Sequence, residues 1–173
     1  SALGMDAAKC FSSYLAALKI QIGSGLARGI DTIAHERGLT IGTVAVLGGD
    51  VGHVYPEENQ NLAEQILTNG GSLLSSFPLR QIPLPQNFPA RNEILAAISA
   101  GVIVVEGAKK SGAVITGRHA LALGKTVVAL TQDFRSDFGQ GAILLNQEGA
   151  VLVTSEAEMD EALRILGNAL EHA

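Results

Sequence analysis

Short runs rich in Val, Ile, Leu and Ala recur along this chain of 173 residues, and stretches with helical spacing separate them. Near-continuous hydrophobicity predicts strands that are covered on both faces, as in parallel sheets. Strands that alternate with helices predict repeated βα units and an open, doubly wound, mostly parallel α/β sheet with helices on both faces. Ligands of such sheets bind beyond the carboxyl ends of the strands, so we expect functional residues there.

The boundaries of these elements follow from the same pattern. We predict strands over 43–49, 71–77, 101–107, 125–131 and 149–155, and helices over 1–18, 29–40, 57–68, 89–100, 113–123, 140–148 and from 156 to the end. Residues 77–92 hold four prolines and predict a long ordered loop that feeds a helix near Pro89. Residues 132–141 predict a second polar loop.

Composition narrows the class of protein. Apolar residues make up 47% and charged residues 17% of the chain, against about 25% charged on average, so much of it is interior. The length predicts one domain, 1–173. Apolar runs stay below the ~18 residues needed to cross a bilayer, which predicts no membrane association. Cys10 is the one cysteine, which excludes an internal disulfide and favours a cytoplasmic setting.

Charge is distributed unevenly along the chain. The net charge of −5 argues against a nucleic-acid partner, because phosphate binding usually leaves a basic surface. Residues 80–118 nevertheless hold five Lys or Arg and two Glu, a balance of +3, whereas residues 148–171 have a balance of −5. A cationic middle and an acidic tail leave a nucleic-acid partner open, and ordinary solvated helix faces explain the pattern equally well.

A glycine-rich turn, "IGSGLARGID", occupies residues 22–31. It is neither the G-x-G-x-x-G fingerprint, whose third glycine would fall at Arg28, nor a Walker loop. Small residues still let a ligand approach the backbone, and amides at a helix start point toward an anion. The predicted phosphate-binding residues are Gly23, Ser24, Gly25 and Arg28. We expect Asp31 to cap the helix or orient the turn, not to bind phosphate. The alternative for the whole segment is a tight structural turn with a surface arginine.

Two further segments offer phosphate or base contacts. Phe88 precedes the Arg91–Asn92 pair, and an exposed aromatic beside cations suits stacking on an unpaired base. The alternatives are a Phe88 that anchors the loop and an Arg91 on the helix surface. A second phosphate cradle is predicted at a helix start, from Lys110, Ser111, Gly112 and Thr116. Its alternative is a surface turn capped by serine. Two cradles in one crevice suit a polymer of phosphates.

The remaining titratable residues predict no catalytic or metal site. His35, His53, His119 and His172 lack the spacing of metal ligands, and we expect His53 and Tyr55 to be structural. Glu106 ends a strand, where satisfying backbone amides explains it better than general base catalysis. We expect Lys109 and Arg118 to be solvated.

Four segments, in chain order, resemble the DprA/Smf family of bacterial DNA-processing proteins: "SGLARGID", "AVLGGDVGHVYPEEN", "FPARNEILAAIS" and "VVEGAKKSGAVITGRHALALGKTVVAL". The match extends from about residue 24 to 153. The resemblance implies an extended Rossmann-like domain that binds single-stranded DNA without base preference. It further implies natural transformation as the setting, loading of the RecA recombinase, homodimers, and no enzymatic activity or cofactor. In the family, the phenylalanine matching Phe88 lies at the DNA groove, which favours stacking.

The chain also departs from the family pattern. The family usually opens with a strand and a Gly-Ser-Arg turn and adds helical or winged-helix domains, so we expect these parts to be missing. Glu93 stands where the family usually has a second arginine, which predicts weakened DNA binding. A scaffold that has lost DNA binding therefore stays open. So does a nucleotide-binding enzyme resembling the lysine decarboxylase-like phosphoribohydrolases, although residues 107–118 lack the P-G-G-x-G-T-x-x-E motif.

Overall fold

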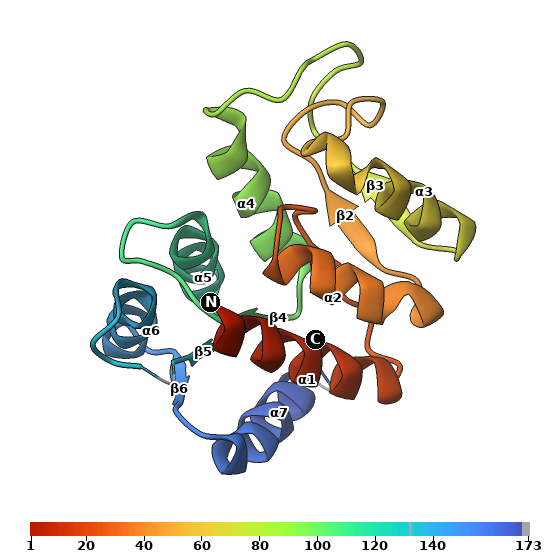
Figure 1. Ribbon diagram of the computed structural model, residues 1–173. Coiled ribbons are helices and arrows are strands. Elements are labelled where there is room, and N and C mark those ends of the chain that lie inside the picture. Colours follow the sequence, from red (N-terminus) through yellow and green to blue (C-terminus); the bar gives the residue numbers. More distant parts are fainter. Residues whose placement is uncertain (132, 171–173) are drawn as a thin grey trace. The chain divides into compact units, whose positions relative to one another are not determined.

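The computed structural model describes residues 1–131 and 133–170. The chain divides into two compact units, Ser1–Arg91 and Asn92–Ala173. Each unit contains a parallel three-stranded sheet with its own helices (Figure 1). Helix α4 (Asn87–Ile98) begins in the first unit and ends in the second.

The sheet of the first unit has the order β1-β2-β3. Its strands are β1 (Gly23–Ser24), β2 (Val44–Val46) and β3 (Ser72–Leu74). Its helices are α1 (Ala2–Ala17), α2 (Ile30–Gly38) and α3 (Gln60–Thr68), with 3-10 turns at Leu39–Ile41 and Glu57–Asn59. Helices α1 and α2 pack side by side (Figure 1). The core is aliphatic, with Leu26, Ala45 and Ile66 fully buried.

The sheet of the second unit has the order β4-β5-β6. Its strands are β4 (Gly101–Val104), β5 (Thr126–Leu130) and β6 (Val151–Val153). Helices α5 (Gly112–Ala122) and α6 (Asp137–Gln147) lie on one side of this sheet, and α7 (Glu156–Leu170) lies on the other (Figure 1). Val114, Ala120 and Leu145 pack against the strands as a second aliphatic core.

The predicted βα alternation with parallel pairing is confirmed. The strands are shorter than predicted. For example, the chain bends at Gly48 after β2 and at Ser76 after β3. Helix α6 begins at Asp137, inside the predicted polar loop, because Ser136 caps it by accepting a hydrogen bond from Gly139 N. The single domain over 1–173 stays a prediction. Among the described residues, no helix combines the length and apolarity that a bilayer span requires.

Candidate nucleic-acid interface

Three connections meet at one edge of the first sheet. The glycine turn follows β1, residues 47–56 follow β2, and residues 75–86 follow β3. Because the three strands are parallel, their carboxyl ends lie at the same edge, where ligands of such sheets bind. The Ser75 hydroxyl donates to the Gly49 carbonyl at 2.5 Å, and Asp50 N donates to the Gln81 carbonyl at 2.9 Å. These bonds tie the second connection to the third.

Asp50 anchors the connections that follow β2 and β3, although the sequence analysis did not single it out. It is 3% exposed, and its carboxylate accepts from Gly52 N at 2.9 Å, from His53 Nδ1 at 2.7 Å and from the amide of Arg80. The hydrogen bond from His53 lowers the pKa of Asp50. His53 is thus a partner of a loop anchor, in line with the structural role expected for it.

The glycine turn is held from both ends. Leu26 adopts φ 61° and is fully buried, and its carbonyl accepts from Asn59 Nδ2 at 2.9 Å. Asp31 Oδ2 accepts from Ala27 N at 3.1 Å, so Asp31 orients the glycine turn and does not cap α2, whose N-cap residue Gly29 makes no side-chain cap hydrogen bond. Asn59 is a contributor that the sequence analysis missed, because it lies more than thirty residues along the chain from the carbonyl that it binds.

Arg91 points into the first unit. The residue is 7% exposed, and its Nη1 donates to the carbonyls of Gly25 and, at 2.8 Å, of Val46. A Cβ on Gly25 would overlap the guanidinium, which explains the glycine at this position. Burial lowers the pKa of Arg91. The structure thus describes Arg91 as a clamp between the glycine turn and β2, and its contact with phosphate stays a prediction.

Phe88 is half-buried over the backbone that follows β2. A Cβ on Gly48 would lie 2.8 Å from the Phe88 ring, so glycine lets the ring approach the main chain. The ring lies 5.8 Å from the Tyr55 ring, centroid to centroid, and 5.5 Å from Arg91 Cζ, in cation–π range. Tyr55 is 51% exposed and extends this aromatic surface, which the sequence analysis did not predict for it.

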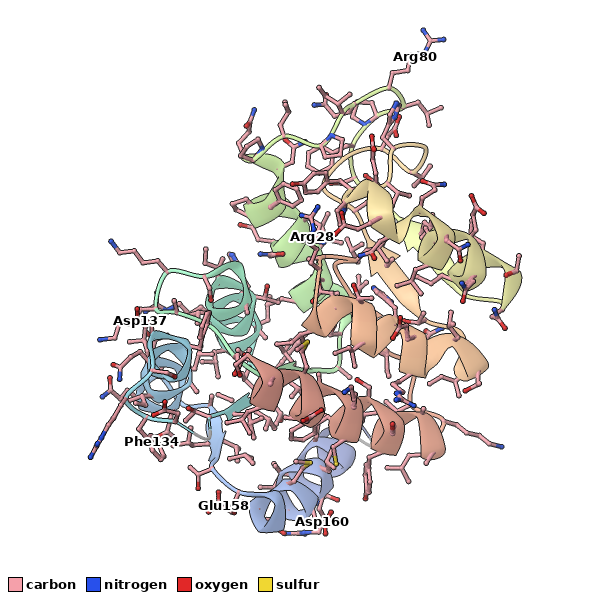
Figure 2. All side chains as sticks on the ribbon, viewed as in Figure 1. Arg28, Arg80, Phe134, Asp137, Glu158 and Asp160 are labelled. Carbon is pink, nitrogen blue, oxygen red and sulfur yellow. The ribbon has the colours of Figure 1, made fainter. Side chains whose placement is uncertain are left out.

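Arg28 projects from the turn before α2 (Figure 2). Its Nη2 donates to Glu58 Oε2 at 2.6 Å, its Nε donates to Glu58 Oε1, and it also contacts the side chain of Tyr55. The hydrogen bond with Glu58 raises the pKa of Arg28, and the guanidinium in turn lowers the pKa of Glu58. Both side chains remain more than half exposed. Arg28, Tyr55, Phe88 and Arg91 therefore form one connected cluster, which we call the aromatic–arginine cluster.

The second predicted cradle lies in the second unit. The Ser111 hydroxyl caps α5 by accepting from Val114 N at 3.4 Å, and Thr116 Oγ1 donates to the Gly112 carbonyl at 3.0 Å. Asn92 Nδ2 donates to the same carbonyl at 3.2 Å. Lys110 is exposed at this helix start. The hydroxyls therefore satisfy the helix in this structure, as the capping alternative expects.

Two charged residues of the second unit have partners at the surface. Arg118 Nη2 lies 2.5 Å from Glu148 Oε1, so this arginine is paired at the surface. Glu93, the departure from the family pattern, is exposed and lies 3.8 Å from His119 Nε2. Over the part of the chain that the structure describes, no group of three or more His, Cys, Asp or Glu could hold a metal ion.

The structure brings the predicted residues together in two sets. The first unit holds Gly23, Ser24, Gly25, Arg28, Phe88 and Arg91, and the second holds Asn92, Lys110, Ser111, Gly112 and Thr116. Within the first unit, Arg91 links the turn to the cluster by direct contacts. A single crevice shared by both sets stays a prediction.

The chain was compared with known proteins. It is 41% identical over 158 residues to protein Smf of Escherichia coli, covering 90% of this chain and 42% of that protein. The X-ray structure of DNA processing protein A (DprA) from Streptococcus pneumoniae superposes with a TM-score of 0.79 at 36% identity, over 91% of this chain and 56% of that chain. DNA processing protein A from Helicobacter pylori, whose structure was described for its single-stranded DNA binding mode, shares the fold. Its TM-score is 0.82 at 24% identity, over 99% of this chain and 76% of that chain.

A family model settles the relationship. The model for DNA recombination-mediator protein A matches residues 1–164, nearly the whole chain and more than the segment on which the resemblance to the DprA/Smf family was based. The chain spans about 42% of the length of the Escherichia coli relative, so it corresponds to part of that protein. This chain belongs to the DNA recombination-mediator protein A family.

Proposed function

We propose that this protein binds single-stranded DNA without base preference, at the carboxyl edge of the first sheet. The observation that carries the proposal is the aromatic–arginine cluster, in which an exposed tyrosine, a half-buried phenylalanine and an exposed arginine adjoin a glycine turn. Stacking on aromatic rings contributes about 1–3 kcal/mol per base and tolerates every base, because each has a π face. The arginine adds a planar fork that fits phosphate.

Each residue of the cluster has a distinct proposed role. Phe88 and Tyr55 stack on unpaired bases, and Arg28 contacts a phosphate. Arg91 acts as a positioning residue, because its guanidinium holds the Gly25 carbonyl and lies 5.5 Å from the centre of the Phe88 ring. In the second unit, the exposed Lys110 and the amides at the start of α5 supply further phosphate contacts.

The wider role follows from family membership. We propose that the protein acts in the uptake and recombination of DNA in natural transformation, by loading RecA onto single strands, as a homodimer in the cytoplasm, and without catalysing a reaction. These statements concern the whole protein, of whose relatives this chain covers about half or less.

Binding of labelled oligonucleotides tests the proposal. We expect single strands to bind more tightly than duplex, because Phe88 and Tyr55 need unpaired bases, and affinity to fall between about 50 and 200 mM salt. Phe88→Ala should weaken binding about fivefold to 100-fold, and Arg28→Ala should weaken it alike for all sequences. Arg28→Ala should leave the melting temperature nearly unchanged, whereas Phe88→Ala should lower it, because the ring packs on the main chain at Gly48, so binding is compared at a temperature where both variants are folded.

Two matched controls accompany these variants. Tyr14 is 40% exposed in α1, outside the connections that follow the strands. Arg164 is an exposed arginine in a two-bond pair with Glu161, at 2.6 and 2.8 Å, like Arg28 with Glu58. Tyr14→Ala and Arg164→Ala should leave affinity unchanged. Absence of single-strand binding at low salt, or equal losses in the control variants, would refute the proposal.

A further inference from the structure

The guanidinium edge of Arg28 that would bind a phosphate is hydrogen-bonded to a carboxylate of the same chain. The Nε and Nη2 atoms of Arg28 both donate to Glu58, one to each carboxylate oxygen. This two-bond arrangement is also how a guanidinium grips a phosphate. A phosphate can therefore take this side of Arg28 only when Glu58 leaves it.

The backbone around Glu58 is fixed to the glycine turn. Asn59, the next residue, is 6% exposed, and its Nδ2 donates to the carbonyl of Leu26 at 2.9 Å and to Thr32 Oγ1 at 3.1 Å. These bonds hold the Glu57–Asn59 turn against the loop from which Arg28 projects. The buried Asn59 thus fixes the backbone of Glu58 next to Arg28. In an ordinary surface ion pair, two long side chains move independently of each other.

We propose that Glu58 determines which ligands this site accepts, by occupying Arg28 until a ligand held at additional points displaces it. The inference rests on the proposed function. Glu58 is tethered next to Arg28, so its effective concentration there is high, and a ligand with one phosphate competes poorly. A nucleic-acid strand that also stacks on Phe88 brings its phosphate to Arg28 at a similarly high effective concentration. The site therefore selects polymeric phosphate over mononucleotides and inorganic phosphate.

Glu58→Gln tests this role, because glutamine keeps the size of the side chain and removes its charge. We expect single-stranded DNA to bind about two- to fivefold more tightly. The slope of log affinity against log salt should steepen by up to about 0.7, because in the wild type the displaced Glu58 carboxylate takes up a cation and offsets one counterion released at the phosphate. We also expect inorganic phosphate to shift the Arg28 Nε–H resonance in the NMR spectrum of Glu58→Gln but not of the wild-type protein.

Glu57→Gln is the matched control, because Glu57 is exposed and lies in the same turn. It changes the net charge equally and should have a much smaller effect. In the Arg28→Ala background, Glu58→Gln should raise affinity less than in the wild type, because no guanidinium is released. Equal gains from the two glutamates, or an equal gain without Arg28, would reduce the effect to general repulsion and overturn the proposal.

The outcomes separate this inference from the proposed function. Wild-type binding with no gain in Glu58→Gln overturns the role of Glu58 and leaves the proposed function standing. Binding by Glu58→Gln alone would overturn both the proposed function and the selection proposed here, because DNA would then fail to displace Glu58 in the wild-type protein. Binding by neither protein, with no phosphate-dependent shift at Arg28, overturns both.

Discussion

The buried guanidinium of Arg91 determines which residue can stand at position 25. Glycine at position 25 leaves room for the buried guanidinium, which bonds to the carbonyls of Gly25 and Val46. Gly25→Ala should therefore lower the free energy of unfolding by more than about 2 kcal/mol, because Arg91 must leave these carbonyls. Urea denaturation measures the effect. Gly167→Ala, in open space inside α7, should instead stabilise by about 0.5–1 kcal/mol. Similar changes in both variants would contradict the explanation.

His35 makes stability depend on pH. It is fully buried, and its Nδ1 lies 2.9 Å from the hydroxyl of Thr43, which itself donates to a carbonyl. Burial lowers the pKa of His35 to about 4, Arg91 acts in the same direction, and Asp31 opposes them. The His35 imidazole therefore takes up a proton below pH 6.5 in the unfolded chain, but only below about pH 4 in the folded protein. Stability is full above pH 6.5 and falls by about 3 kcal/mol across this window.

Denaturation at a series of pH values checks this window. In the variant His35→Gln, whose side chain does not titrate, the slope between pH 6.5 and 4 should flatten, whatever the stability at pH 7. An unchanged slope in His35→Gln would assign the pH dependence to other groups. The exposed His53 provides a comparison, because His53→Gln should retain most of the slope.

Helix α4 ends on a side chain from another element. Lys125, next to the start of β5, donates its Nζ to the carbonyls of Ala96 at 2.9 Å, Ala97 at 2.5 Å and Ser99 at 2.5 Å. These carbonyls lack partners further along the helix, and a cation at the carboxyl end is favourable. Lys125→Met should therefore destabilise by about 2 kcal/mol and speed amide exchange after Ile98. Lys109 is exposed, so Lys109→Met should change neither the stability nor the amide exchange. Equal amide exchange rates in the two variants would argue against a capping role of Lys125.

At the scale of the whole molecule, the residues that follow the strands distinguish a DNA-binding protein from a nucleotide-cleaving enzyme. Glu106 is the one carboxylate between β4 and α5, and residues 107–118 contain no Asp or Glu that could take the place of the glutamate in the phosphoribohydrolase motif. We therefore expect incubation with nucleoside monophosphates to release no free base, as monitored by chromatography. Release of base would instead assign the protein to the phosphoribohydrolase-type enzymes. The purified Arg164→Ala control should then release base at the same rate as the wild type.

Much of this architecture was already present in the order of residues. Apolar runs alternating with helical stretches predicted parallel βα units, because burial on both faces leaves a strand few polar positions. The same pattern placed Arg28, Phe88 and Lys110 just after strands or at the helix starts that follow. Asp31 was expected to cap the helix or to orient the turn, and it does the second, by accepting from an amide four residues earlier in the chain. Local spacing determines such features.

The tertiary structure alone decided which side chains meet. Arg91 reaches a carbonyl 66 residues away, and Glu58 meets Arg28 across 30 residues. Tyr55 likewise lies against Phe88 because the loop after β2 folds beside the start of α4. Periodicity gives the face on which a residue lies, but the partner depends on how separate loops pack at the sheet edge. For this reason Arg91, predicted as a phosphate contact, is buried between two carbonyls in this structure, and the overlooked Glu58 occupies the predicted phosphate site on Arg28.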